Sequence, residues 1–290
     1  MNHLLIATDG SPSAREAVTV GLELAKAQGA DVALLHVLPP DKFRTARMAS
    51  RAIPHDVEID ASDVALEEAG QRAEAEGVAY ALERVSGETV ETIVGLANEG
   101  DADLIVLGSR GRGAAMSALL GSVSNGVLHH AGRPVLIVRD GTHRNGAGSA
   151  RPWPTKILVA YDGFEHSNGA VRTAIDLFHS GADITVLSVV PPDARGSKSG
   201  GHVGLRPHAH EDVARAHAAL REKGIEARME IAYGEVVESI CSAAADEDVD
   251  LLVVGSRRLG AVGRLALGSV SGELVHRAPC PVLVAAEDRE

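Results

Sequence analysis

The chain has 290 residues, of which 45% are hydrophobic and only 2% aromatic, and its formal net charge is −12. This length favours two domains of ordinary size, and cores built from aliphatic residues suit parallel sheets covered by helices. The negative charge argues against a general nucleic-acid-binding protein, since neutralising phosphates requires clustered lysine and arginine.

The N-terminal sequence and the cysteines favour a cytoplasmic protein. Residues 1–10 contain a short apolar run without a basic segment, which is typical of a first strand and not of a signal peptide. No apolar run approaches the roughly 20 residues of a membrane span, so we expect no membrane association. Two cysteines do not make a disulfide framework, which favours a reducing compartment. We expect Cys241 in a core and Cys280 nearer the surface.

The first half alternates short apolar runs with amphipathic segments. Its first run leads to Thr8, Asp9 and Gly10, after which Ser11 supplies a helix N-cap and Pro12 the first helical position. The spacing predicts strands over residues 4–7, 32–38, 78–85, 104–107 and 134–138, and helices over residues 12–28, 61–76, 90–97 and 122–130. This alternation predicts an α/β fold with a mostly parallel, doubly wound sheet and right-handed crossovers.

The same pattern restarts after a stretch rich in glycine, serine, asparagine, arginine and proline. We expect a first domain over residues 1–140, a linker over residues 141–155 and a second domain over residues 156–290. Asp162 lies 153 residues after its counterpart Asp9, whereas Gly255 lies only 147 residues after Gly108. The separation drifts in order along the chain, which indicates a duplicated domain.

A glycine-rich loop follows the fourth strand of each half. In the first half it begins at Gly108 and ends at Gly121, just before a predicted helix. Glycine lets the backbone approach a ligand closely, and the N–H groups and dipole of a helix N-terminus favour an anion. The loop therefore predicts a phosphate site. Neither loop contains a Walker A sequence or the dinucleotide fingerprint Gly-x-Gly-x-x-Gly.

Together these residues resemble the universal stress protein family, over essentially the whole chain and twice. Gly108, Gly111, Gly121 and Ser122 match its pattern Gly-x2-Gly-x9-Gly-(Ser/Thr), and the first strand ends at Asp9. A second strand that ends in His-Val completes the likeness. The resemblance implies a five-stranded parallel sheet of order 3-2-1-4-5 in each half. Because the glycine motif is associated with the family's ATP binders, it also implies ATP as the ligand, with or without Mg²⁺.

The resemblance further implies a set of nucleotide-binding residues in each half. Asp9 would lie near the ribose, the backbone of Val37 would meet the adenine edge, and the loop and helix start would surround the phosphates. The first set is Ala7, Thr8, Asp9, Val37, Gly108, Ser109, Arg110, Gly111, Arg112, Gly113, Gly121, Ser122, Val123 and Ser124. The second set is Ala160, Asp162, Val189, Gly255, Ser256, Arg257, Arg258, Gly260, Gly268, Ser269, Val270 and Ser271.

Arg258 stands where the first half has Gly111, and this leaves two alternatives for the second site. The arginine would disturb the loop, or its guanidinium would contact phosphate directly. We expect a nucleotide-dependent sensor or regulator of the stress response, with at most slow ATP hydrolysis and no assigned catalytic residue. The alternative is a structural or interaction protein whose pockets are vestigial or hold another ligand. We also expect an unidentified protein partner, and an internal pseudo-dimer or homodimer that pairs the terminal strands.

Overall fold

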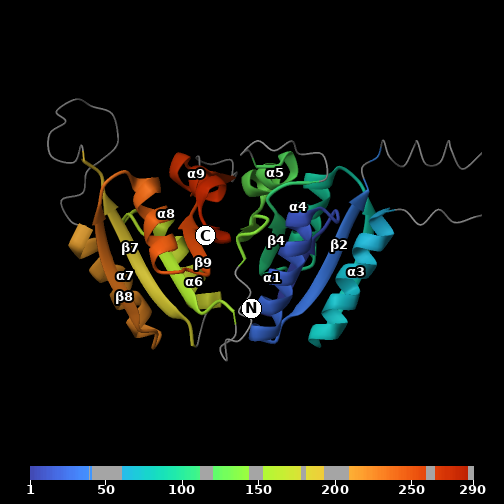
Figure 1. Ribbon diagram of the computed structural model, residues 1–290, viewed down its shortest axis with the longest axis horizontal. Helices are drawn as coiled ribbons and strands as arrows, with labels where there is room; N and C mark the ends of the chain where they lie inside the picture. The colour runs from blue at the N-terminus through green and yellow to red at the C-terminus, as the bar shows by residue number, and fades with distance from the viewer. Residues whose placement is uncertain are drawn as a thin grey trace, which may run out of the picture. The chain divides into compact units, whose positions relative to one another are not determined.

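The computed structural model describes residues 1–38, 40, 61–111, 120–143, 153–177, 181–192, 209–258 and 265–286. These residues form two compact units, Met1–His143 and Arg144–Glu290 (Figure 1). The expected linker and domain limits remain predictions.

The first unit is a five-stranded parallel sheet of order β3-β2-β1-β4-β5. Helices α1 and α3 pack together over one face, and α4 and α5 pack together over the other. The elements are β1 (His3–Ala7), α1 (Pro12–Gln28), β2 (Asp31–Leu38), α3 (Ala61–Glu76), β3 (Tyr80–Ser86), α4 (Thr89–Glu99), β4 (Leu104–Gly108), α5 (Ser122–His130) and β5 (Val135–Val138).

The second unit has a sheet of the same order, β8-β7-β6-β9-β12, again all parallel. Its elements are β6 (Lys156–Ala160), α6 (Glu165–Leu177), β7 (Asp183–Val190), α7 (Ala209–Glu222), β8 (Ala227–Tyr233), α8 (Val236–Asp246), β9 (Leu251–Gly255), β10 (Arg257–Arg258), β11 (Leu265–Ala266), α9 (Ser269–Arg277) and β12 (Val282–Ala285). The predicted α/β fold and the 3-2-1-4-5 order are confirmed in both units.

Helix α1 forms where the sequence places its start and stop signals. The side chain of Ser11 accepts a hydrogen bond from the N–H of Ala14, and Pro12 occupies the first helical position, where a missing N–H costs nothing. Gly29 ends the helix in the left-handed conformation, at φ 66°. The first helix is therefore encoded locally, by its caps.

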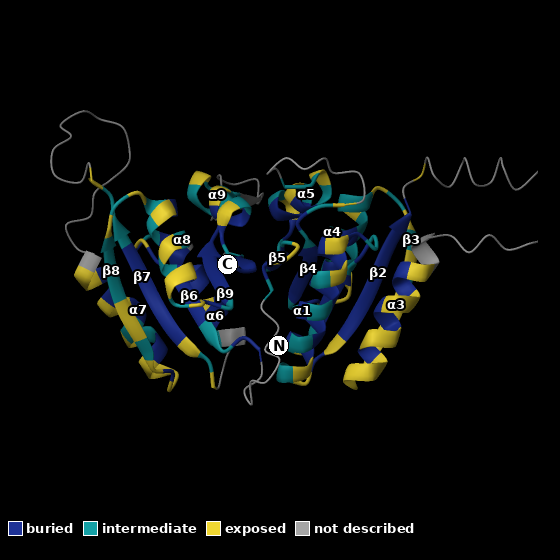
Figure 2. Cartoon of the chain, viewed as in Figure 1, coloured by how far each residue is buried: buried dark blue, intermediate teal, exposed yellow. Residues whose placement is uncertain are grey.

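The core of each unit lies on the central strands. Leu4, Leu5 and Ile6 of β1 are at most 2% exposed, and Leu251 and Leu252 of β9 are fully buried. Figure 2 shows these strands as buried ribbons flanked by helices with one exposed side. Burial on both faces explains why the strands are continuous aliphatic runs and not alternating ones. Within the described residues, we find no helix long and apolar enough to cross a membrane.

Three local predictions were wrong. Strand β3 begins at Tyr80 and not at residue 78, because Val78 donates its N–H to Ala73 and so belongs to the end of the α3 turn. Cys280 is only 2% exposed, whereas Cys241 is half-buried, the reverse of the expected pair. Cys280 lies two residues before β12, whereas the aligned Arg133 of the first unit is half-exposed.

Candidate functional site

A cavity of about 150 Å³ opens at the carboxyl ends of the first unit's strands. It lies between the tips of β1 and β4, at the point where the strand order reverses, because β1 has β2 on one side and β4 on the other. Doubly wound sheets bind their ligands at this switch point. The cavity is therefore the natural candidate site of this unit.

Eleven residues predicted from the sequence line this one cavity. The tips of β1 and β2 contribute one group, and the glycine loop with the start of α5 contributes the other. They are Ala7, Thr8, Asp9, Val37, Gly108, Arg110, Gly111, Gly121, Ser122, Val123 and Ser124. Ser109 is buried beside them, and its N–H donates to the carbonyl of Val138. Arg112 and Gly113 lie outside the described residues.

Six further residues line the cavity that the sequence argument did not assign. They give it an apolar wall and two polar groups, and they are Ala14, Leu35, His36, Thr89, Ile93 and Leu107. Leu35 and His36 lie on β2, and Thr89 and Ile93 lie on α4. The sequence pattern does not show which residues of these elements lie beside the end of β1. The His-Val pair at the end of β2 was the one sequence signal that could have pointed to His36.

The N-terminus of α5 faces this cavity without a side-chain cap. Gly121 is the N-cap residue and has no side chain to accept the first N–H groups, and the first turn contains no acidic residue. Uncapped N–H groups and the positive end of the helix dipole favour an anion at this point. The hydroxyl of Ser124 donates to the carbonyl of Gly108 at 2.7 Å, so this side chain ties α5 to the loop.

Asp9 is the acidic side chain of this cavity. Its Oδ1 accepts the N–H of Ser11 at 3.0 Å, which holds the carboxylate against the turn between β1 and α1. Its Oδ2 lies beside Gly111, where a Cβ would be 2.8 Å from the oxygen.

The second unit places its predicted residues at corresponding points of its own sheet. Ala160 ends β6, Val189 is near the end of β7, Gly268 is the N-cap of α9, and Gly260 lies outside the described residues. The hydroxyl of Ser271 donates to the carbonyl of Gly255 at 2.7 Å, as Ser124 does to Gly108. Ser269 and Val270, also of the second set, lie in the first turn of α9.

The strand tip and the loop of the second unit differ from those of the first. Tyr161 occupies the position of Thr8; its hydroxyl donates to Asn168, and burial raises the pKa of its phenol. Asp162 is exposed, and its Oδ1 accepts the N–H of Phe164 at 3.0 Å. Ser256 directs its hydroxyl to the carbonyl of Ala285.

Arg258 does not occupy a copy of the Gly111 backbone. Arg257 and Arg258 form strand β10, which pairs antiparallel with Leu265 and Ala266 of β11. In the first unit, Gly111 is not part of any strand. A side chain at the Gly111 position would lie 2.8 Å from Oδ2 of Asp9, so the carboxylate or the loop would have to shift.

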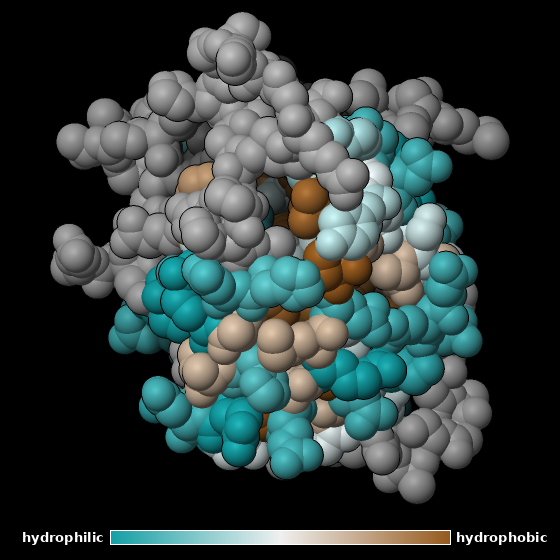
Figure 3. Space-filling model, turned by 90° about the vertical axis from the view of Figure 1, so that its left-hand side faces the viewer, coloured by the Kyte–Doolittle hydropathy of each residue, from teal (hydrophilic) through white to brown (hydrophobic). Residues whose placement is uncertain are grey.

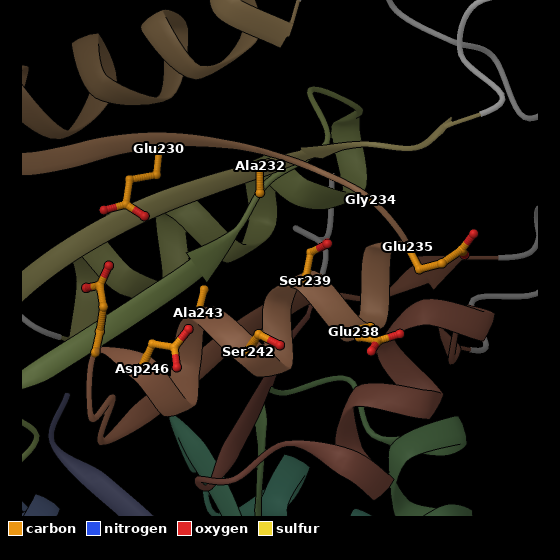
Figure 4. A pocket seen from close by; sticks show the side chains of 10 residues that line it. Glu230, Ala232, Gly234, Glu235, Glu238, Ser239, Ser242, Ala243 and Asp246 are labelled. Carbon is orange, nitrogen blue, oxygen red and sulfur yellow. The ribbon is translucent and has the colours of Figure 1, made fainter.

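A larger groove, of about 540 Å³, lies between β8 and α8 of the second unit (Figure 4). Its charged lining residues are all acidic: Glu230, Glu235, Glu238, Asp246 and Glu247. Burial raises the pKa of Glu230, and the adjacent Glu247 carboxyl raises it further. Figure 3 shows the side of the molecule that is on the left in Figure 1; its coloured surface is mostly hydrophilic, with a smaller number of hydrophobic residues between the hydrophilic ones. Because like charges repel, the groove does not suit a phosphate-bearing ligand.

Comparison with known proteins finds a matching family model and similar proteins of the same family. A family model described as the universal stress protein family matches residues 1–139 and again residues 154–286. A universal stress protein of Mycobacterium tuberculosis is 32% identical over 220 residues, which cover 70% of this chain and 68% of that protein. Another from the same organism is 27% identical and covers 97% of this chain and 94% of that protein.

A solved structure supports the fold over the full length. The crystal structure of a universal stress protein from Archaeoglobus fulgidus aligns with a TM-score of 0.72 at 24% sequence identity. The alignment covers 99% of each chain.

Proposed function

This chain belongs to the universal stress protein family, and we propose that its first unit binds an adenine nucleotide, ATP, at the cavity between β1 and β4. The observation that carries the proposal is that eleven residues predicted from the glycine motif and the strand tips line this single cavity. In this proposal the bound nucleotide favours one conformation and thereby changes the affinity for a protein partner. The chain then acts as a nucleotide-dependent regulator of the stress response.

The cavity suits the nucleoside end of the ligand. Its volume of about 150 Å³ is below the roughly 300–1,000 Å³ of sites that enclose a whole small molecule. The apolar side chains of Leu35, Ile93 and Leu107 would pack against the base, while backbone groups at Val37 meet its edge. Asp9 would accept a hydrogen bond from a ribose hydroxyl.

The phosphates would lie outside this enclosed part, along the glycine loop and the start of α5. The N–H groups that follow Gly121 are free of a side-chain cap and would donate to phosphate oxygens. Arg110, which lines the cavity, would supply a positive charge. Mg²⁺ that accompanies ATP would be bound mainly by the phosphates, since Mg²⁺ usually takes few ligands from a protein.

We propose binding without rapid turnover because the acid–base side chains that line the cavity have backbone hydrogen-bond partners at the strand tip. Asp9 accepts the N–H of Ser11, and His36 directs Nδ1 to the carbonyl of Thr8. Both groups are therefore used to hold the strand tip. We propose slow hydrolysis at most.

Calorimetric titration of ATP into the full chain tests this proposal, with Asp9→Ala and Asp162→Ala as a matched pair. The two aspartates follow β1 and β6, and each accepts an N–H of the next turn. We expect ATP to bind the wild-type chain and Asp162→Ala alike, and Asp9→Ala to bind at least about tenfold more weakly. A wild-type chain that neither carries nucleotide when purified nor binds ATP at millimolar concentration would overturn the proposal.

A further inference from the structure

His36 holds the tip of β1 from the neighbouring strand. Its Nδ1 lies 2.6 Å from the carbonyl oxygen of Thr8, and the residue is 7% exposed. Because a carbonyl only accepts hydrogen bonds, Nδ1 carries the proton in this contact. The N–H of Thr8 donates in turn to the carbonyl of Leu35 at 2.9 Å. Both backbone groups of Thr8 are thus fixed by β2, directly before Asp9.

Two serines at the start of α1, the N-cap Ser11 and Ser13 of the first turn, hold Arg110 of the glycine loop. The hydroxyls of Ser11 and Ser13 lie 2.9 Å and 2.7 Å from the carbonyl oxygen of Arg110. The N–H of Arg110 is 3.2 Å from the Ser13 hydroxyl, so Ser13 faces both backbone groups of this residue. The backbone of Arg110 is therefore held at the edge of the cavity by side chains that need no ligand.

The second unit has different residues at all three positions. Counted from its strand-tip aspartate, Phe164 and His166 correspond to Ser11 and Ser13, and Ser188 precedes Val189 as His36 precedes Val37. Phenylalanine has no hydroxyl to donate. A serine is also shorter than a histidine by most of an imidazole ring. The turn of the second unit bonds to itself, since the hydroxyl of Ser167 donates to the carbonyl of Phe164 at 2.8 Å.

A buried acid from α7 also lies against the tip of the second unit. The carboxylate of Asp212, a residue only 2% exposed, is so close to Gly163 that a Cβ there would be 2.3 Å from Oδ2. Its carboxylate pairs with Arg215 of the same helix. The corresponding part of α3 in the first unit carries Val64 and Ala65. The second tip thus meets an Asp–Arg pair, where the first unit has apolar residues at the corresponding positions.

We propose that Ser11, Ser13 and His36 are positioning residues that pre-form the nucleotide site of the first unit, and that the second unit, lacking them, leaves the chain with one nucleotide site. The inference rests on the proposed function and specifies its stoichiometry. A site held in its binding geometry before the ligand arrives loses less entropy on binding. In the second unit, Arg257 and Arg258 of β10 pair antiparallel with β11.

The experiment compares His36→Leu with His36→Asn in the full chain. The side-chain amide of asparagine places an N–H near the position of Nδ1 and can still donate to the carbonyl of Thr8, whereas leucine cannot. We expect His36→Leu to weaken ATP binding by about five- to tenfold, the effect of one lost buried hydrogen bond. We expect His36→Asn to bind within about threefold of wild type. Ser188→Ala, the matched change in the second unit, should leave ATP affinity and stoichiometry unchanged.

The titration also gives the number of sites, and thermal unfolding without nucleotide shows whether each variant is folded. One ATP per chain, with loss in His36→Leu and rescue in His36→Asn, supports the inference. Two equivalent sites per chain, or equal affinity in the leucine and asparagine variants, overturns it while leaving ATP binding itself intact. Absence of any binding by the wild-type chain instead overturns the proposed function.

Discussion

Asp9 and Gly111 face each other at the candidate site, so close that a side chain on residue 111 would displace the carboxylate or the loop. A Cβ at Gly111 would lie 2.8 Å from Oδ2 of Asp9, inside normal contact distance. The strand tip therefore approaches the glycine loop with the carboxylate of Asp9 against the backbone of Gly111, which has no side chain. In the second unit, which has Arg258 at this position, Arg257 and Arg258 pair antiparallel with Leu265 and Ala266.

Gly111→Ala is predicted to weaken ATP binding with little effect on the stability of the fold. The added methyl group would push the loop away from Asp9 and so misplace both ligand contacts; we expect about a tenfold loss of affinity. Calorimetric titration measures it. Gly95→Ala in α4 is the control, because a Cβ there meets nothing within 4 Å and alanine favours the helix by about 1 kcal/mol. Equal ATP affinity in Gly111→Ala and wild type would contradict the placement of the ligand.

Arg110→Ala is predicted to discriminate between ATP and adenosine. If Arg110 contacts phosphate, its removal costs a charge-assisted hydrogen bond, and ATP affinity falls by about tenfold or more. Adenosine affinity should change little. Arg15→Ala is the matched control, since Arg15 of α1 forms an exposed pair with Glu68 of α3, and neither residue lines the cavity. A similar loss for both ligands would show that Arg110 acts on the shape of the loop and not on phosphate.

Gly108→Ala is predicted to destabilise the first unit directly. A Cβ at this position would lie 2.6 Å from the backbone N of Ala14, which is fixed in the first turn of α1. Relieving this contact requires the helix to move, at a cost of about 1–3 kcal/mol in the free energy of unfolding. Hydrogen exchange of the α1 and β4 amides would report it. Gly126→Ala, whose close contact is the Val90 side chain, should be milder; equal protection in Gly108→Ala and wild type would refute the prediction.

Glu230→Gln is predicted to raise the melting temperature at neutral pH. The pKa of Glu230 is raised in the folded state by burial and by Glu247, so the folded state binds this proton more tightly than the unfolded state. The resulting contribution to the free energy of unfolding is full below the ordinary glutamate pKa and is lost as the pH rises through the folded pKa. A neutral glutamine removes this cost, which for a partly exposed pair is below about 1 kcal/mol.

The gain should shrink as the pH falls below the range in which Glu230 takes up its proton. Glu226→Gln removes the same charge from an exposed position and serves as the control. Thermal unfolding at neutral and acidic pH measures both variants. If they shift the melting temperature equally at neutral pH, the interaction between Glu230 and Glu247 does not cost stability.

The sequence predicts most of the fold because its signals are local. Ser11, Pro12 and Gly29 mark the ends of α1, and the aliphatic run before Asp9 has the length and flanks of a buried strand. The hairpin of β10 and β11 was not predicted, since two-residue strands leave no periodicity to read. The start of β3 was misplaced because Val78 is apolar yet completes the α3 turn.

Much of the lining of the candidate site could also be predicted, because strand tips and helix starts define it. The contacts that hold it could not. His36 meets Thr8 across 28 residues of sequence, and Ser13 meets Arg110 across 97. These pairs depend on which strands are neighbours and on their register, which composition and periodicity do not reveal. The acidic groove beside β8 was not predicted for the same reason, since its carboxylates come from β8 and from α8 with its flanking residues.

Titration of ATP into the full chain by calorimetry tests the central claim, that the cavity of the first unit is a nucleotide site, most directly. We predict saturable binding of one ATP per chain that weakens in Gly111→Ala and is unchanged in Asp162→Ala. No heat of binding at millimolar ATP, or binding that is unaffected by changes at Asp9 and Gly111, would contradict it.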